Sequence, residues 1–253
     1  MYRANPIKAK LRQGRPVYGP WLSTPSPDTA EILSLCGFDF LILDQEHGPG
    51  QITDAIAQMR AAKGGETALL ARVPWNDPIY LKRILDAGIE GVLIPMVEDV
   101  VAAKQAAGAC RYPPIGFRGA AAQMRGTSYG FAADYYDTVN DNILVAVQIE
   151  SAGAVKRIPE IAAVPGIDMV FIGPRDLSAS IGKLNKFDDP EVKALVSQAE
   201  TAIKASGKWL GSVATSAADA KAKAARGYNL LIPASDVSLL RAAALDLAKQ
   251  LTA

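Results

Sequence analysis

Residues 68–96 read ALLARVPWNDPIYLKRILDAGIEGVLIPM, two apolar runs on either side of a more polar segment. Both runs are rich in Leu, Ile and Val on alternating faces, which is typical of parallel strands that are buried on both sides. Between them, the tripeptide Asn-Asp-Pro at 76–78 places a capping side chain and a proline at a helix entrance. The stretch therefore predicts a strand, a helix and a second strand.

The same alternation of apolar runs and helical segments recurs along the whole chain of 253 residues. The predicted strands are 17–22, 38–43, 68–73, 91–96, 143–149, 168–172, 209–213 and 229–233. Units of about 32 residues match a (β/α)8 TIM barrel, so residues 1–253 are expected to form one barrel domain. A doubly wound sheet is the alternative, but it usually carries GxGxxG or GxxxxGK[ST], and neither pattern occurs.

The composition excludes several classes of protein. The 27 Lys+Arg and 26 Asp+Glu are interleaved, which disfavours binding to nucleic acid. The first twenty residues lack the apolar run of a signal peptide, and no apolar run is long enough for a membrane span, so we expect a cytosolic protein without a membrane partner. Cys36 and Cys110 show no CxxC spacing and are predicted to be reduced, buried thiols.

Two segments depart from the regular pattern. Residues 111–142 form a long insertion rich in Gly, Arg and Tyr, and loops of this length in a compact domain tend to be functional. Residues 237–251 are apolar around much of a helix circumference. A helix of this kind requires burial on more than one side, which predicts a contact between subunits.

Carboxylates follow two neighbouring strands near the middle of the chain. Glu150 comes directly after one predicted strand, and Asp176 comes shortly after the next. Mg²⁺ and Mn²⁺ prefer oxygen ligands and often take one or two protein carboxylates, with substrate and water completing the shell. The sequence therefore predicts a two-carboxylate metal site; the alternative is that both residues cap the helices that follow.

A histidine and an arginine stand at the same predicted end of the fold. His47 is the single histidine of the chain and is flanked by Asp44 and Glu46, whose charges would raise its pKa, so it suits a general base. Arg72 closes an apolar strand, where a guanidinium can bind a carboxylate or stabilise an enolate. Ion pairing of Arg72 with Asp44 or Glu46 is the alternative. No lysine ends a predicted strand, which disfavours a Schiff-base mechanism.

Four motifs resemble a known family in order and over nearly the whole chain. They are D-x-E-H from Asp44, R-x-x-W-N-D-P from Arg72, Q-I-E from Gln148 and F-I-G-P-x-D-L-S from Phe171. This combination resembles the HpcH/HpaI aldolases, which are class II pyruvate aldolases. Within the family, the sequence is most similar to the 4-hydroxy-2-oxoheptanedioate type, with the 2-dehydro-3-deoxyglucarate type nearby.

The resemblance implies a role for each matching residue. It implies a divalent metal (Mg²⁺, Mn²⁺ or Co²⁺) on Glu150 and Asp176, His47 as catalytic base, Arg72 as enolate stabiliser, substrate contacts from Gln148 and Arg175, and Asp86 as the acid that raises the basicity of the histidine. The relatives carry a small residue where this chain has Arg175. The predicted topology places Asp86 far from His47, so either a neighbouring subunit supplies it or the helix boundary differs.

The resemblance also implies a reaction and an assembly. The reaction is reversible cleavage of a 4-hydroxy-2-oxo acid into an aldehyde and pyruvate, or a related 2-oxo acid such as hydroxypyruvate. The alternatives are a metal-dependent C–C lyase of an acyl-CoA or phosphorylated 2-oxo acid, and a non-catalytic 2-oxo-acid binding protein. The implied assembly is a homo-hexamer, a trimer of dimers with exchanged C-terminal helices, which the apolar segment 237–251 would suit.

Overall fold

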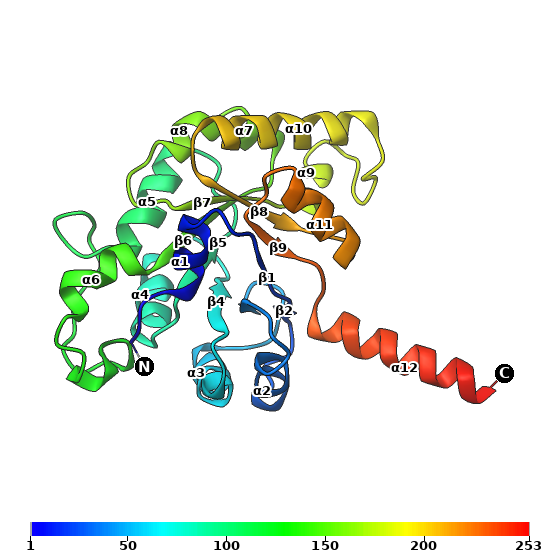
Figure 1. Cartoon of the computed structure of the whole chain (residues 1–253). Coiled ribbons are helices and arrows are strands. Elements are labelled where there is room, and N and C mark those ends of the chain that lie inside the picture. Colours follow the sequence, from blue (N-terminus) through cyan, green and yellow to red (C-terminus); the bar gives the residue numbers. More distant parts are fainter. Residues whose placement is uncertain (1, 253) are drawn as a thin grey trace.

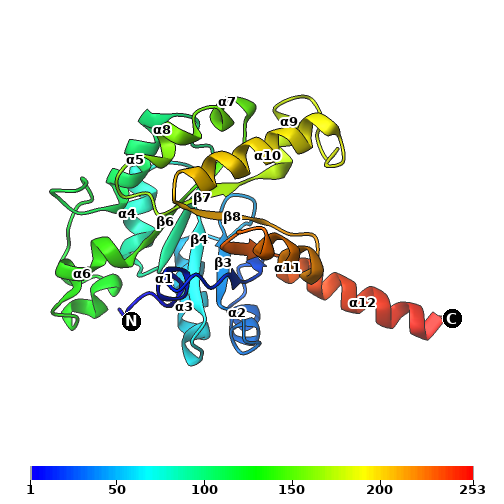
Figure 2. The ribbon, with the colours of Figure 1, turned by 45° about the horizontal axis from the view of Figure 1, so that its top comes forward.

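A curled, all-parallel sheet with helices on its outer side forms the body of the computed structural model, which describes residues 2–252 (Figures 1 and 2). The strands are β1 (Val17–Tyr18), β2 (Trp21–Leu22), β3 (Phe40–Asp44), β4 (Ala68–Arg72), β5 (Gly91–Ile94), β6 (Leu144–Ile149), β7 (Met169–Ile172), β8 (Trp209–Val213) and β9 (Leu230–Ile232). The helices are α1 (Pro6–Arg12), α2 (Pro27–Ser34), α3 (Ile52–Ala61), α4 (Pro78–Asp86), α5 (Val100–Cys110), α6 (Tyr135–Asn142), α7 (Ala152–Val155), α8 (Ile158–Ala162), α9 (Pro174–Ala179), α10 (Pro190–Ala205), α11 (Ala217–Ala225) and α12 (Asp236–Thr252), with short 3₁₀ segments η1 (Ala62–Gly64) and η2 (Arg125–Gly130).

The strand order corrects the prediction of a closed eight-stranded TIM barrel, which was wrong. Within residues 2–252 the sheet has nine strands in the order β1-β9-β8-β7-β6-β5-β4-β3-β2, so β1 and β2 are its two edges. The sequence predicted these two as one strand over 17–22, but Gly19 and Pro20 separate them. Pro20 has no N–H to donate, and a Cβ on Gly19 would lie 1.9 Å from the carbonyl oxygen of Phe40. Before these two residues the chain pairs with β9, as β1. After them it pairs with β3, as β2.

The other seven predicted strands are present, with ends that differ from the predicted ones by at most two residues. Their side chains are buried on both faces, as the parallel pattern predicted. One set, including Phe40, Leu93 and Phe171, fills the inside of the curl together with Ile7 of α1. The other set packs beneath the outer helices. The burial of both faces explains why these segments read as continuous apolar runs.

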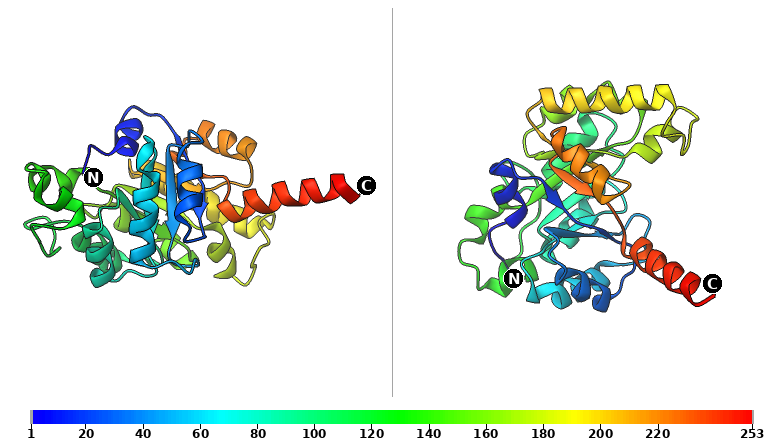
Figure 3. Two further views of the ribbon diagram at one scale, coloured as in Figure 1. Left: turned by 90° about the horizontal axis from the view of Figure 1, so that it is seen from below. Right: turned by 45° about the vertical axis from the view of Figure 1, so that its right-hand side comes forward.

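The C-terminal helix α12 extends away from the body in every view (Figure 3). Its first residue, Asp236, is buried and accepts hydrogen bonds from the backbone N–H groups of Ser23 and Thr24, at 2.9 and 3.0 Å. From Val237 to Thr252 the side chains are exposed, and Leu251 is 78% exposed. The predicted apolar helix is thus present, and within residues 2–252 nothing covers its apolar side chains.

The insertion 111–142 packs at the amino end of the sheet rather than at the carboxyl end. It contains η2 and α6, and the Ser128 side chain accepts a hydrogen bond from the backbone N–H of Tyr2 at 2.9 Å. Within this chain the insertion therefore lies away from the strand ends that carry the candidate active site.

The two cysteines differ in exposure. Cys110 is buried, as predicted, and burial raises the pKa of its thiol to about 12. Cys36 is exposed, so the prediction of two buried thiols was wrong for this residue. It follows α2, at a surface turn that the cysteine spacing could not reveal. Among residues 2–252, no helix is both long and apolar enough to cross a membrane.

Candidate active site

The predicted polar residues lie together at the carboxyl ends of β3, β4, β6 and β7. This end of the sheet is called the carboxyl edge below, to distinguish it from the edge strands β1 and β2. Asp44 and Arg72 are the last residues of β3 and β4 and are direct partners in the parallel register. Gln148 lies in β6, and Glu150 is the first residue after this strand. Asp176 lies in the first turn of α9, which begins just after β7. Parallel pairing alone is sufficient to gather these side chains.

Arg72 is fixed by two carboxylates and an aromatic ring. Its Nε and Nη2 donate to the two oxygens of Asp44 at 2.9 and 2.6 Å, and Nη1 lies 2.9 Å from Glu46 Oε2. The guanidinium stacks 4.3 Å from the centre of the Trp21 ring. The ion pairs that the sequence left open as an alternative are therefore present. They hold the cation in one orientation at the strand end.

Glu150 is a buried carboxylate whose position is set by three groups. It accepts a hydrogen bond from the backbone N–H of Met96 at 2.8 Å and another from the amide of Gln148. Met96 has a left-handed φ of 53°, uncommon for a residue with a side chain, and this conformation accompanies the N–H contact to Glu150. A Cβ at Gly173 would lie 2.9 Å from Glu150 Cγ, so the glycine leaves room for the carboxylate.

Burial disturbs the protonation of two carboxylates in this group, Glu46 and Glu150. Burial raises the pKa of Glu150; the hydrogen bonds from Gln148 and the Met96 N–H act in the opposite direction, and the negative charge of Asp176 adds a smaller rise. The pKa of Glu46 is raised to about 7, first by burial and then by the charges of Glu150, Asp44 and Asp176, while Arg72 acts in the opposite direction. The edge thus holds more negative charge than Arg72 can neutralise.

The donor set fits a hard divalent cation. Among the described residues, no group of three or more His, Cys, Asp or Glu side chains is arranged to hold a metal ion. A cation held by Glu150 and Asp176 would keep positions for water and substrate, as Mg²⁺ often does. Two buried oxygens nearby, Gln148 Oε1 and Glu46 Oε2, accept no well-directed hydrogen bond from the described residues, although Glu46 Oε2 is ion-paired with Arg72. All these donors are oxygens, the ligand type that Mg²⁺ and Mn²⁺ prefer.

The remaining predicted residues occupy different surroundings. The His47 side chain is 67% exposed, and its Nε2 lies 3.8 Å from Glu46 Oε2. Arg175 is exposed beside Asp176 at the rim. Asp86 is the last residue of α4, at the amino end of the sheet, where its carboxylate accepts a hydrogen bond from buried Arg118 at 2.7 Å. The structure therefore brings His47 to the same edge as the carboxylates, and it places Asp86 elsewhere in this chain.

Two residues of the site were not singled out from the sequence. Glu46 was considered as a neighbour of His47 and as a possible ion-pair partner of Arg72, but not as a residue of the site, although its charge interacts with every other carboxylate there. Trp21 was missed because its strand was treated as regular; an aromatic residue at the carboxyl end of a strand was the available signal. Its ring packs edge-on against Phe171, with 6.5 Å between ring centres.

A family model for the HpcH/HpaI aldolase/citrate lyase family matches residues 18–243. The chain belongs to this family. The resemblance drawn from the four motifs is confirmed, and with it the assignment to an aldolase and lyase enzyme family. The match begins at β1 and extends into α12, so it includes every residue of the candidate site.

Named relatives of this family member cover almost its full length. A 5-keto-4-deoxy-D-glucarate aldolase from Enterobacter sp. (strain 638) is 41% identical over 244 residues, 96% of this chain and 95% of the relative. A solved HpcH/HpaI aldolase/citrate lyase family protein from Burkholderia cenocepacia J2315 is 36% identical, with a TM-score of 0.94 over 98% of this chain and 100% of the other. An HpcH/HpaI aldolase from Desulfitobacterium hafniense DCB-2 is 30% identical, with a TM-score of 0.90 and coverage of 98% and 97%.

Proposed function

We propose that this chain is a divalent-metal-dependent aldolase that reversibly cleaves a 4-hydroxy-2-oxo acid into an aldehyde and pyruvate, or a related 2-oxo acid such as hydroxypyruvate. The observation that carries the proposal is the group of carboxylates at the carboxyl ends of the strands: Glu150 is buried and oriented by the Met96 N–H and Gln148, Asp176 lies in the first turn of α9, and Arg72 is already paired with Asp44 and Glu46. The curated relatives are named for 5-keto-4-deoxy-D-glucarate, so a keto-deoxy sugar diacid is the substrate we propose first, ahead of 4-hydroxy-2-oxoheptanedioate.

Glu150 and Asp176 are the residues that would hold the metal, and Mg²⁺, Mn²⁺ and Co²⁺ are the proposed ions. When bound, a divalent cation supplies Lewis-acid polarisation of the keto oxygen of a 2-oxo acid. Gln148 and the Met96 N–H keep Glu150 in place before the ion arrives. Such preorganisation lowers the cost of assembling the site.

The other residues at this edge act on the substrate itself. Arg72, fixed by Asp44 and Trp21, presents a positive charge where the enolate oxygen develops during cleavage. His47 takes the proton of the 4-hydroxyl group as general base. Gln148 contacts the 2-oxo acid portion. Arg175, exposed at the rim, suits the second carboxylate of a diacid substrate. This contact would explain why the chain has an arginine where the relatives have a small residue.

The assembly completes this proposal. Asp86 cannot reach His47 within the chain, so we propose that it acts on the His47 of a neighbouring subunit. The uncovered apolar side chains of α12 support a homo-oligomer with exchanged C-terminal helices, and we propose a hexamer built as a trimer of dimers. The cytosolic location remains a prediction of the sequence.

The test is metal binding by Glu150→Gln and Asp176→Asn, followed with Mn²⁺ by electron paramagnetic resonance. Each substitution should weaken Mn²⁺ binding by at least about 100-fold, because even partners of metal ligands typically contribute about 10- to 100-fold. Asp188→Asn is the matched control, since Asp188 is fully exposed and, among the described residues, pairs only with Lys193. Circular dichroism should show the same fold in all four proteins.

Several outcomes would contradict the proposal. Unchanged Mn²⁺ binding in both variants would remove the metal site from this edge. Trapping of pyruvate on the protein by borohydride would indicate a lysine imine instead. Tight binding of an acyl-CoA or phosphorylated 2-oxo acid would favour the lyase alternative, and pyruvate binding without turnover would favour a binding protein.

A further inference from the structure

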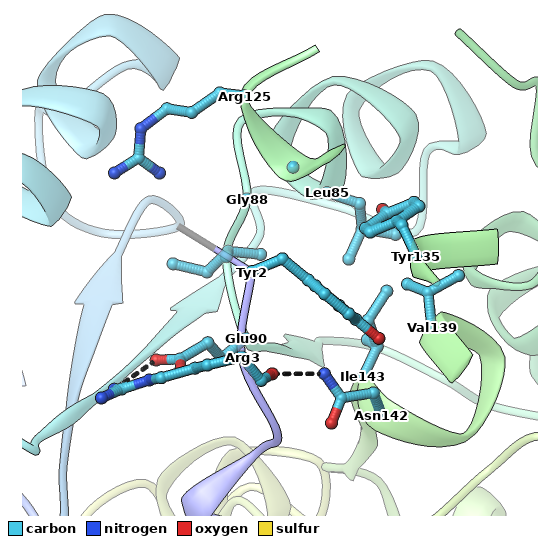
Figure 4. Close-up of a pocket in the computed structure, with 12 residues that line it drawn as sticks. Tyr2, Arg3, Leu85, Gly88, Glu90, Arg125, Tyr135, Val139, Asn142 and Ile143 are labelled. Atoms are coloured by element: carbon cyan, nitrogen blue, oxygen red, sulfur yellow. Dashed lines mark hydrogen bonds and ion pairs between the residues drawn. The ribbon is translucent and has the colours of Figure 1, made fainter. Parts of the chain in front are cut away.

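Two adjoining cavities open at the amino end of the sheet, opposite the candidate active site. The larger has a volume of about 290 Å³ and lies between α3, the turn over residues 62–67 and η2. The smaller, of about 30 Å³, is drawn in Figure 4. Both are lined by Arg3, Gly88, Glu90 and Arg125. The volume of the larger cavity is close to the lower limit of typical small-molecule sites.

The lining of the larger cavity is strongly cationic. It includes Arg3, Lys63 and Arg125 against a single carboxylate, Glu90. Glu90 is already engaged, because Oε1 lies 2.6 Å from Arg3 Nε and Oε2 accepts a hydrogen bond from the backbone N–H of Leu69 at 2.8 Å. Arg3 is thereby neutralised, as the dashed line in Figure 4 shows. Lys63 and Arg125 are left without that compensation.

Arg125 is a partly buried cation without an anionic partner. Its Nη1 donates to the carbonyl oxygen of Ala87 at 2.7 Å, and no carboxylate of the described residues forms an ion pair with it. Burial lowers the pKa of Arg125, and the positive charge of Arg60 acts in the same direction, whereas Tyr129 and Glu90, neither of which forms an ion pair with it, act in the opposite direction. Removing a cation from water without a counter-charge is unfavourable. An anion in the cavity would relieve this cost.

We propose that the larger cavity is a binding site for one small dianion, a phosphate or a compact dicarboxylate, held by Arg125 and Lys63. The planar fork of a guanidinium binds two oxygens of such an anion at once, and the ammonium group adds a second charge. The site lies at the other end of the sheet from Arg72 and Glu150.

The experiment is isothermal titration of the full-length protein, as purified, with inorganic phosphate and separately with succinate. Ionic strength is held constant with NaCl, because salt screens such contacts. We expect one of the two anions to bind once per chain. Arg125→Gln should weaken this binding by about 10- to 100-fold, the value of a charge-assisted hydrogen bond, and Lys63→Gln should weaken it less.

Three further variants distinguish binding in this cavity from binding at another surface and from loss of the fold. Arg15→Gln is the matched control, because Arg15 is exposed, and it should bind like the wild type. Arg125→Lys retains the charge and should retain part of the affinity, which distinguishes lost binding from lost folding. Binding that is weakened by Arg72→Gln but not by Arg125→Gln would place the anion at the carboxyl edge and overturn the proposal. Absence of binding by both anions would also overturn it.

Discussion

Asp168 at the amino end of the sheet and Glu46 at its carboxyl end are both carboxylates beside arginine, yet their surroundings differ. Asp168 accepts from Lys8 at 2.8 Å, from Arg111 at 2.9 Å and from the backbone N–H of Val145 at 2.9 Å. Glu46 shares Arg72 with Asp44, and its Oε2 accepts no well-directed hydrogen bond from the described residues. The pKa of Glu46 is raised to about 7, mainly by burial.

The difference separates a group that stabilises the fold from a group that belongs to a site. At the amino end, each buried charge near Asp168 has an opposite charge and a hydrogen bond, so the cluster joins α1 to β6 and β7. At the carboxyl end, like charges are held close together. Such an arrangement costs stability unless a cation is present, and it is typical of functional sites.

The largest expected effect is on the rate of aldol cleavage, after a substitution among the residues at the carboxyl end of the sheet. His47→Ala should slow aldol cleavage about 10²–10⁴-fold, the usual contribution of a positioned general base. The free energy of unfolding should change little, because His47 is mostly exposed. Steady-state kinetics on a 4-hydroxy-2-oxo acid and urea unfolding measure the two quantities. Since His47 is the single histidine, NMR titration of its imidazole should match the acidic limb of the pH–rate profile. A wild-type rate with an unmoved limb would exclude His47 as the base.

The next effect concerns stability at the amino end. Asp168→Asn should lower the free energy of unfolding by about 3–5 kcal/mol, because it leaves Lys8 and Arg111 buried without a counter-charge. Asp39→Asn is the matched control: Asp39 also accepts from a backbone N–H and a lysine, but Lys10 is 35% exposed, so a loss of about 1 kcal/mol is expected. Urea unfolding at one protein concentration measures both. Equal losses in the two variants would contradict the distinction.

The smallest effect is a pH dependence at the carboxyl end. The pKa of Glu46 lies near 4.5 in the unfolded chain and at about 7 in the folded protein, so the folded state binds the proton more tightly. The stabilisation from this group is complete below the unfolded pKa and is lost as pH rises through about 7. The thermal unfolding midpoint of chelator-treated protein should therefore fall as the pH rises from about 4.5 to about 7. In Glu46→Gln the fall should be smaller; an identical fall would show that Glu46 does not cause it.

Much of the fold and most of the site were predictable because they depend on local signals. Apolar runs mark parallel strands wherever both faces are buried, and the proline and capping residue at 77–78 mark the start of α4. Arg72, Gln148 and Glu150 were found because strand ends can be located from these runs. Cys36 was misassigned because cysteine spacing and the usual burial of free cysteines do not show that this residue lies at a surface turn after α2.

The sequence by itself determined the parallel strand–helix repeat, the family and the set of polar residues at the strand ends, because each depends on residues that are close together in the chain. Only the tertiary structure decided that the chain over 17–22 divides into two edge strands, since this depends on how closely Gly19 approaches Phe40. It also decided that Glu46 shares Arg72 with Asp44 and that Asp86 pairs with Arg118. Distances between residues far apart in the chain, and the burial that shifts their pKa values, arise only when the sheet curls and its ends are assembled.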